Sequence, residues 1–100
     1  VDTGPMLSKA TTPISNTDTA ESLHDRMAVL GGDLLVDTLP RYIEGELKPQ
    51  PQPDDESLIT YAPQIKKEEG KILWADSAAS IDRLVRAFTP WPGTFTTWGS

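Results

Sequence analysis

A proline-rich stretch at the centre of the chain constrains its fold more than any other feature. In residues 46–56, Pro49, Pro51 and Pro53 alternate with glutamines, and three acidic residues follow them. Proline has no backbone N–H and a fixed φ, so this stretch excludes a helix and favours extended polyproline II. The acidic residues keep it solvated. We therefore interpret it as a semi-rigid linker, since the P-x-x-P spacing of a proline-motif ligand is missing.

An amphipathic helix is predicted before this linker, over residues 18–45. Asp18, with Glu21 three residues later, gives a capping-box pattern at its start. Apolar residues then recur at three- and four-residue steps, which places them on one helix face. These residues are Ala20, Leu23, Met27, Leu30 and Leu34.

Glycine and proline interrupt this helical pattern. Gly31 and Gly32 would each cost about 1 kcal/mol relative to alanine in a helix interior, so they mark either a break or a close packing contact. The apolar stripe resumes after them, which favours a continued or lightly kinked helix. Pro40 is expected to bend the helix, and Gly45 is expected to end it.

A second, shorter helix is predicted after the linker, capped by Asp76 or Ser77. The residues expected on its inner face are Ala78, Ile81, Leu84, Val85 and Phe88. The residues predicted to point outward or to a rim are Asp82, Arg83 and Arg86.

Short strands are predicted at four places, on the basis of β-branched, aromatic or grouped apolar residues. These are residues 6–14, 58–61, 71–74 and 94–98. A charged turn or a single helical turn is predicted at residues 66–70. Both ends of the chain are expected to lie within longer elements, because the last strand has no partner before residue 100.

The composition excludes several kinds of site. The chain has no cysteine, which removes disulfides, thiolate metal sites and cysteine nucleophiles. Its single histidine, His24, has no second histidine or cysteine to complete a metal site. The formal net charge of −6 argues against a nucleic-acid-binding surface spread over the whole chain. From the residues alone, the chain is a fragment or an adaptor with two amphipathic helices.

Six stretches of the sequence together resemble the methionyl-tRNA formyltransferase family. They are Val1-Asp2-Thr3-Gly4-Pro5-Met6-Leu7, Thr12-Pro13-Ile14, Ser22-Leu23-His24-Asp25-Arg26, Thr60-Tyr61-Ala62-Pro63, Lys67-Glu68-Glu69-Gly70 and Arg86-Ala87-Phe88-Thr89-Pro90-Trp91-Pro92-Gly93. They occur in the order and spacing of the family and cover nearly all of the chain. The last stretch, with the pattern RAF-x-PWPG, is specific to this family and its near relatives.

The resemblance implies an α/β fragment. Residues 1–46 would hold the C-terminal strand and helix of a Rossmann-like formyltransferase catalytic domain. Residues 47–63 would be the linker. Residues 64–100 would hold the helix and first strand of an OB-like β-barrel domain that helps to bind tRNA.

The resemblance also implies an enzyme of translation initiation. It would transfer a formyl group from 10-formyltetrahydrofolate, as co-substrate, to the amino group of methionyl initiator tRNA. The resemblance further implies a monomeric enzyme in the cytoplasm or an organelle. It implies neither a membrane partner nor a metal. These residues alone are expected to be inactive, because the family's catalytic Asn and His and its S-L-L-P folate loop would lie upstream of Val1.

Three candidate site residues come from the family's D-T-G motif. Asp2 matches its catalytic aspartate, and Thr3 and Gly4 would shape the loop around the folate. A carboxylate beside the catalytic histidine raises the pKa of that histidine and can order a water for proton movement.

Four basic residues are candidates for tRNA contact. Lys66 and Lys67 lie at the family's K-E-E segment near the interdomain boundary. Arg83 and Arg86 match basic positions on the second helix, where a structural contact is at least as well supported as a tRNA contact.

Two alternatives remain open. Other formyltransferases and hydrolases that use 10-formyltetrahydrofolate share the Asp2 region, but they account less well for the proline–tryptophan signature. A non-catalytic helical interaction module, with two amphipathic helices around a proline-rich spacer, is the alternative from a different class. In-frame codons for the catalytic Asn and His upstream of position 1 would favour the enzyme.

Overall fold

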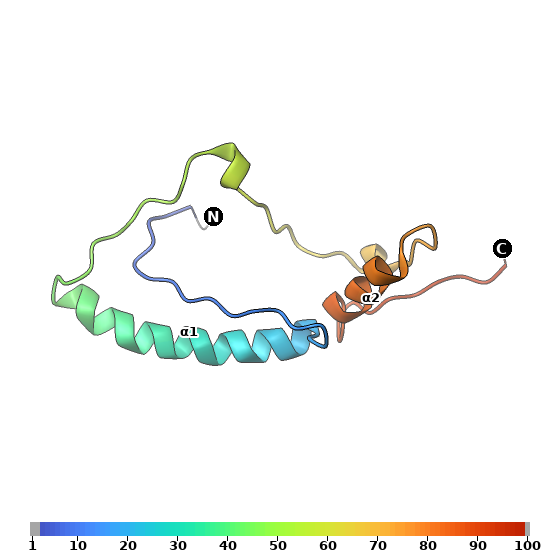
Figure 1. The fold of residues 1–100 in the computed structure, drawn as a ribbon, viewed down its shortest axis with the longest axis horizontal. Helices are drawn as coiled ribbons and strands as arrows, with labels where there is room; N and C mark the ends of the chain where they lie inside the picture. Colours follow the sequence, from blue (N-terminus) through green and yellow to red (C-terminus); the bar gives the residue numbers. More distant parts are fainter. Residues whose placement is uncertain (1–2, 100) are drawn as a thin grey trace. The chain divides into compact units, whose positions relative to one another are not determined.

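The computed structural model describes residues 3–99. Its regular elements are the helices α1 (Ala20–Ile43) and α2 (Ala78–Ala87) and the short 3₁₀ helices η1 (Glu56–Leu58) and η2 (Lys67–Gly70), as Figure 1 shows. The described residues form two compact units. Unit 1 holds residues 3–12 and 27–62, and unit 2 holds residues 13–26 and 63–99. Each unit is described by itself.

Helix α1 is confirmed, but Thr19 and not Asp18 caps it. The Thr19 hydroxyl accepts a hydrogen bond from the Ser22 N–H at 3.1 Å, and the Ser22 hydroxyl accepts one from the Thr19 N–H at 2.9 Å. This reciprocal pair is a capping box in which Ser22 replaces the expected Glu21. Asp18 is drawn into a different set of contacts, described below.

The helix continues without a break through Gly31, Gly32 and Pro40. A Cβ atom built on either glycine would meet no atom within 4 Å. The two glycines therefore mark neither a break nor a close packing contact.

Gly45 ends the helix as predicted. Its φ of 81° lies in the left-handed region that favours glycine. The Gly45 N–H donates to the Tyr42 carbonyl at 3.0 Å, and the Glu46 N–H donates to the Arg41 carbonyl at 2.9 Å. These two hydrogen bonds form a Schellman motif, which satisfies carbonyls that a helix end leaves free.

The predicted strands are not formed within the described residues. Within residues 3–99 the structure has two isolated β-bridges and no strand; Met6 is antiparallel to Gln50, and Lys71 is parallel to Phe95. A pleated sequence becomes a stable strand only when neighbouring strands supply a ladder, and a two-stranded pair is marginal by itself. The helical part of the expected α/β fragment is thus observed, whereas its strands are not.

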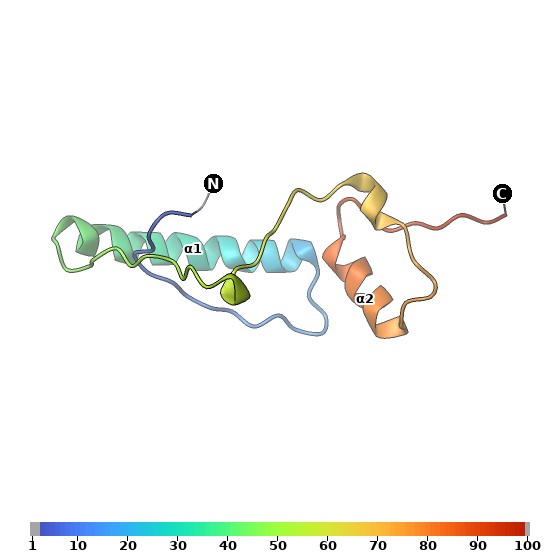
Figure 2. The ribbon, with the colours of Figure 1, turned by 90° about the horizontal axis from the view of Figure 1, so that it is seen from above.

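The proline-rich stretch is not helical, as expected, but it is more than a spacer. The Met6 N–H donates to the Gln50 carbonyl and the Gln50 N–H donates to the Met6 carbonyl, each at 2.7 Å. Residues near Gln50 therefore run beside the N-terminal segment, and both ribbon views show the two segments close together (Figures 1 and 2).

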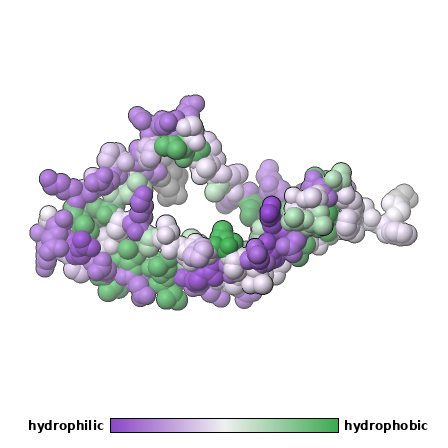
Figure 3. Space-filling model, viewed as in Figure 1, coloured by the Kyte–Doolittle hydropathy of each residue, from purple (hydrophilic) through white to green (hydrophobic). Residues whose placement is uncertain are grey.

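Helix α1 exposes more apolar surface than the predicted stripe accounts for. None of the described apolar side chains is fully buried. Met27, expected on the inner face, is 53% exposed, and Val29, Val36 and Ile43 form a second exposed stripe at seven-residue steps. Figure 3 shows hydrophobic side chains at the surface over this helix. Even so, the described part of the chain contains no helix long and apolar enough to cross a membrane.

Helix α2 in unit 2 is confirmed, although Ala78 and Val85, both expected on its inner face, are exposed. Of the two expected caps, Ser77 is used, and its hydroxyl accepts a hydrogen bond from the Ser80 N–H at 3.1 Å. Ile81, Leu84 and Phe88 are half-buried along one face, as the apolar spacing predicted.

After α2, the backbone of the proline–tryptophan stretch packs directly on Gly70. The peptide bonds before Pro90 and Pro92 are cis. The Phe95 N–H donates to the Gly70 carbonyl at 3.0 Å, and a Cβ on Gly70 would lie 2.2 Å from the carbonyl oxygen of Gly93. Only glycine therefore fits at position 70.

Two glycine-to-alanine substitutions are expected to have opposite effects. Gly70→Ala should lower the free energy of local opening in unit 2 by about 1–3 kcal/mol, because its methyl group overlaps backbone that must shift. Gly31→Ala should stabilise α1 by up to about 1 kcal/mol, because alanine favours the helix and has open space there. Amide hydrogen exchange by NMR measures both, at Phe95 and within α1. Slow exchange at Phe95 in Gly70→Ala would contradict the close approach.

Candidate functional site

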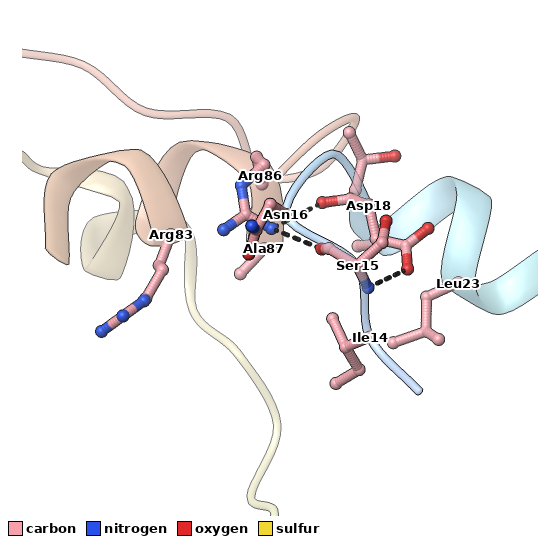
Figure 4. A pocket seen from close by; sticks show the side chains of 10 residues that line it. Ile14, Ser15, Asn16, Asp18, Leu23, Arg83, Arg86 and Ala87 are labelled. Carbon is pink, nitrogen blue, oxygen red and sulfur yellow. Dashed lines mark hydrogen bonds between the residues drawn. The ribbon is translucent and has the colours of Figure 1, made fainter. Parts of the chain in front are cut away.

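A groove of about 440 Å³ lies in unit 2 between the start of α1 and α2 (Figure 4). Its apolar lining includes Ile14, Leu23 and Ala87, and its charged lining includes Asp18 and two arginines of α2. The turn before α1 and the second half of α2 thus bring together side chains from distant parts of the sequence.

The buried carboxylate of Asp18 forms a bidentate ion pair with the more exposed Arg26 at this groove. The Asp18 side chain is only 8% exposed. The two Nη atoms of Arg26 donate to its two carboxylate oxygens, at 3.0 Å and 2.7 Å. The Ser22 hydroxyl and the Ser15 N–H each donate to it at 2.8 Å. The carboxylate is therefore fully engaged by the turn and the first turns of α1.

These contacts fix the charge of Asp18. The Arg26 guanidinium, with the Ser15 N–H and the Ser22 hydroxyl, holds the pKa of the Asp18 carboxyl far below its usual range, against the opposing effect of burial. The same pair raises the pKa of Arg26. Asp18 therefore remains an anion near neutral pH and orders the start of α1, rather than exchanging protons with a substrate.

Arg86 connects α2 to the turn before α1. Its Nη1 donates to the Asp18 carbonyl at 3.0 Å and approaches the Ser15 carbonyl at 3.4 Å, as the dashed lines in Figure 4 show. Its Nε donates to the Asp82 carboxylate at 3.0 Å. Arg86 therefore makes structural contacts. This is one of the two roles that the sequence allowed for it, the other being contact with tRNA.

Arg83 is arranged differently, although it lies only three residues earlier on α2. Its guanidinium extends away from Arg86 in Figure 4. Within the described range, neither Arg83 nor Asn16 of the groove has a side-chain hydrogen bond or ion pair. The Arg83 guanidinium therefore keeps its donors available to a ligand.

The other predicted site residues do not line this groove. Lys66 and Lys67 are exposed in unit 2, at the start of η2. Thr3 and Gly4 are exposed in unit 1, where the Gly4 carbonyl accepts a hydrogen bond from Nε2 of Gln52 at 2.8 Å. Asp2 lies outside the described residues.

His24 lies on the exposed surface of α1. Its Nδ1 is 3.4 Å from the carboxylate of Asp25, and both side chains are mostly exposed. Across residues 3–99, no three or more His, Cys, Asp or Glu side chains gather in a way that could hold a metal ion.

Two interacting pairs were missed by the sequence analysis. The pair of Asp18 and Arg26 was missed because Asp18 fits a capping pattern equally well, and only the folded turn directs it to Arg26. The contact of Gln52 with Gly4 spans 48 residues along the chain, which no local pattern reports. The only sequence feature that could have indicated this contact is that Gln52 is a polar residue between two prolines.

Comparison with known proteins gives matches over nearly the whole chain. Residues 64–100 match the family model described as formyl transferase, C-terminal domain. A protein from Marinobacter nauticus named methionyl-tRNA formyltransferase is 50% identical over 99 residues, which cover 99% of this chain and 31% of that protein. Proteins with the same name from Gluconobacter oxydans and Citrifermentans bemidjiense are 50% and 49% identical over 97% and 96% of the chain, each covered to 30%.

Over nearly its whole length, the chain is similar to a segment of proteins named methionyl-tRNA formyltransferase. The resemblance drawn from the six sequence stretches is thereby confirmed. The chain spans about a third of the length of the curated relatives that it matches. The part that matches the C-terminal domain of formyl transferases contains Lys66, Lys67, Arg83 and Arg86.

The lowered pKa of Asp18 predicts an acid-sensitive start of α1. Because this pKa is below the ordinary value of 3.8, the ion pair stabilises the folded turn above about pH 4 and is lost as the pH falls further. Asp18→Asn should have less helix at pH 7 than the unaltered chain and should lose less of it on acidification. Circular dichroism at 222 nm between about pH 7 and pH 2 measures this.

Asp33→Asn is the matched control. Asp33 is an exposed α1 residue without an ion pair among the described residues, so this variant should keep the acid-induced loss of helix. The role assigned to Asp18 would be contradicted if both variants lost helix equally on acidification.

Proposed function

We propose that this chain is part of an enzyme that transfers a formyl group from 10-formyltetrahydrofolate to the amino group of methionyl initiator tRNA. The observation that carries the proposal is the identity of 50% over almost the whole chain to a relative named methionyl-tRNA formyltransferase. The reaction would serve translation initiation in the cytoplasm or an organelle. We further propose that the enzyme is a monomer, has no membrane segment and uses no metal.

The proposal includes the domain organisation implied by the family. Residues 1–46 would belong to a Rossmann-like catalytic domain and residues 47–63 to a linker. Residues 64–100 would open an OB-like tRNA-binding domain, which the match of this range to the formyl transferase C-terminal domain supports. The strands of both domains would then need partners beyond the described residues.

Asp2 is the proposed catalytic residue of the segment. In formyl transfer, the methionyl amino nitrogen attacks the formyl carbon and a tetrahedral intermediate forms. The bond from this carbon to the folate nitrogen then breaks, the attacking nitrogen loses a proton, and the departing folate nitrogen gains one. Asp2 would raise the pKa of the neighbouring catalytic histidine and order a water for this proton movement.

Thr3 and Gly4 would shape the loop around the folate co-substrate. A Cβ built on Gly4 would meet no atom within 4 Å, so the loop has open space on this side. Glycine at this position therefore fits the close approach of a bound group to the backbone.

Four basic residues would contact tRNA. Arg83 has the strongest support, since this residue borders the groove and its guanidinium has no hydrogen bond or ion pair among the described residues. Lys66 and Lys67 are exposed, whereas Arg86 is held by structural contacts. Residues 64–100 contain five Lys and Arg against four Asp and Glu, so the acidity of the chain as a whole lies mostly outside this region. A tRNA surface here is compatible with the net charge of −6.

Asp2→Asn tests the proposed catalysis. The assay uses the grafted enzyme, in which these 100 residues replace the matching segment of the Marinobacter nauticus relative. The substitution should lower kcat for formylation by about 100- to 10,000-fold, the usual contribution of acid–base catalysis. The affinity for tRNA should be nearly unchanged, because Asp2 is not proposed to bind it. Equal kcat values with and without the substitution would reject the catalytic role of Asp2, and a folded but inactive grafted enzyme would reject the function.

Arg83→Gln tests the tRNA contact. If Arg83 contacts one phosphate, the slope of log affinity against log salt concentration should become shallower by about one in the grafted enzyme. Lys9→Gln, at an exposed lysine in unit 1, removes the same charge and should leave the slope unchanged. Equal slopes for the unaltered and Arg83→Gln proteins would show that Arg83 does not contact phosphate.

A further inference from the structure

Every second residue of the N-terminal segment 4–8 is held by a residue distant in the sequence. The Gly4 carbonyl accepts a hydrogen bond from the side chain of Gln52, and Met6 pairs with Gln50 through both its N–H and its carbonyl. The Ser8 hydroxyl is 2.7 Å from the hydroxyl of Thr38, which is buried in α1. The segment that follows Asp2 is therefore anchored at three successive alternate positions.

The proline spacing of the linker suits this pairing. In an antiparallel pair, every second residue directs its N–H and carbonyl towards the partner. Continuing from the pair of Met6 and Gln50, the next such pair is Gly4 and Gln52. The prolines at 49, 51 and 53 occupy the positions between, where a missing N–H removes no hydrogen bond to the partner. Because proline alternates with glutamine, the backbone N–H groups that remain are those that face the N-terminal segment 4–8.

At Gly4 the anchor is a side chain. Nε2 of Gln52 donates to the Gly4 carbonyl at 2.8 Å. Gly4 lies two residues after Asp2, and a glycine without a side chain of its own needs external contacts to restrict its backbone. A displacement of about 1 Å at a reacting group can lower a rate up to about 100-fold. A hydrogen bond that fixes this backbone is therefore expected to affect the reaction rate.

We propose that the proline-rich linker positions the backbone at Thr3 and Gly4, the residues that follow Asp2 in the sequence, and that Gln52 is a positioning residue for the reaction. This inference rests on the proposed function. Gln52 would act on the reaction through the Gly4 carbonyl, to which its Nε2 donates. The main-chain pairing of Met6 with Gln50 sets the register that brings Gln52 opposite Gly4.

Gln52→Glu in the grafted enzyme tests the inference. Glutamate has the same shape, but its carboxylate has no N–H to donate and repels the Gly4 carbonyl. We expect kcat to fall about tenfold while KM for tRNA and for the folate stays unchanged, because a misplaced loop affects reaction geometry rather than binding. Gln52→Lys, which keeps an N–H donor of similar reach, should restore most of kcat.

Lys48→Gln is the matched control. It lowers the net charge by the same amount within the same proline-rich stretch, and Lys48 is exposed and makes no backbone hydrogen bond to residues 4–8. We expect its kcat to equal that of the unaltered grafted enzyme. Equal kcat values for Gln52→Glu and Lys48→Gln in an active grafted enzyme would overturn the positioning role and leave the proposed function intact.

Hydrogen exchange of the grafted enzyme, measured by mass spectrometry, supplies a readout that needs no activity. In Gln52→Glu, peptides covering residues 3–8 should exchange faster, whereas peptides from α1 should not change. A folded but inactive grafted enzyme would overturn the proposed function together with the kinetic role of Gln52. Unchanged exchange in residues 3–8 would overturn the anchoring by Gln52 itself.

Discussion

The carboxylate of Asp18 receives hydrogen bonds from the turn before α1, from the first turn of α1 and from Arg26. The carbonyl of the same residue receives Arg86 from α2. A single residue thus joins the three parts of unit 2 that form the groove. Since the described residues include no fully buried apolar side chain, such polar contacts define the geometry more than packing does. Removing Arg26 would leave the mostly buried Asp18 carboxylate without its charged partner. An uncompensated buried charge lowers the stability of any protein.

The ends of α1 show the same dependence on local hydrogen bonds. A reciprocal pair of Thr19 and Ser22 starts the helix, and a Schellman motif at Gly45 ends it. Between these ends the helix passes through two glycines and a proline. Apolar residues lie on more than one of its sides, a distribution more typical of buried helices than of surface helices.

The sequence could predict features that depend on neighbouring residues. The two helices, the Ser77 cap and the Gly45 stop follow from short-range patterns, and all are present. The strands could not be predicted in this way, because a strand depends on partners elsewhere that a β-branched run such as residues 94–98 does not specify. The sequence alone does not distinguish the roles of Arg83 and Arg86, because both are arginines on the same helix beside the groove. Only the folded turn, which places two carbonyls beside Arg86, distinguishes a structural arginine from an available one.

The alternation of proline and glutamine also determines what cannot bind to the linker. A strand edge normally presents N–H groups on both sides, and its open side can recruit another extended chain. At Pro49, Pro51 and Pro53 the outward positions carry no N–H at all. The linker can therefore pair with residues 4–8 on one side while its other side offers no donors at these positions for adding a further strand. The same spacing that permits an intramolecular contact thus protects an exposed, extended segment from self-association.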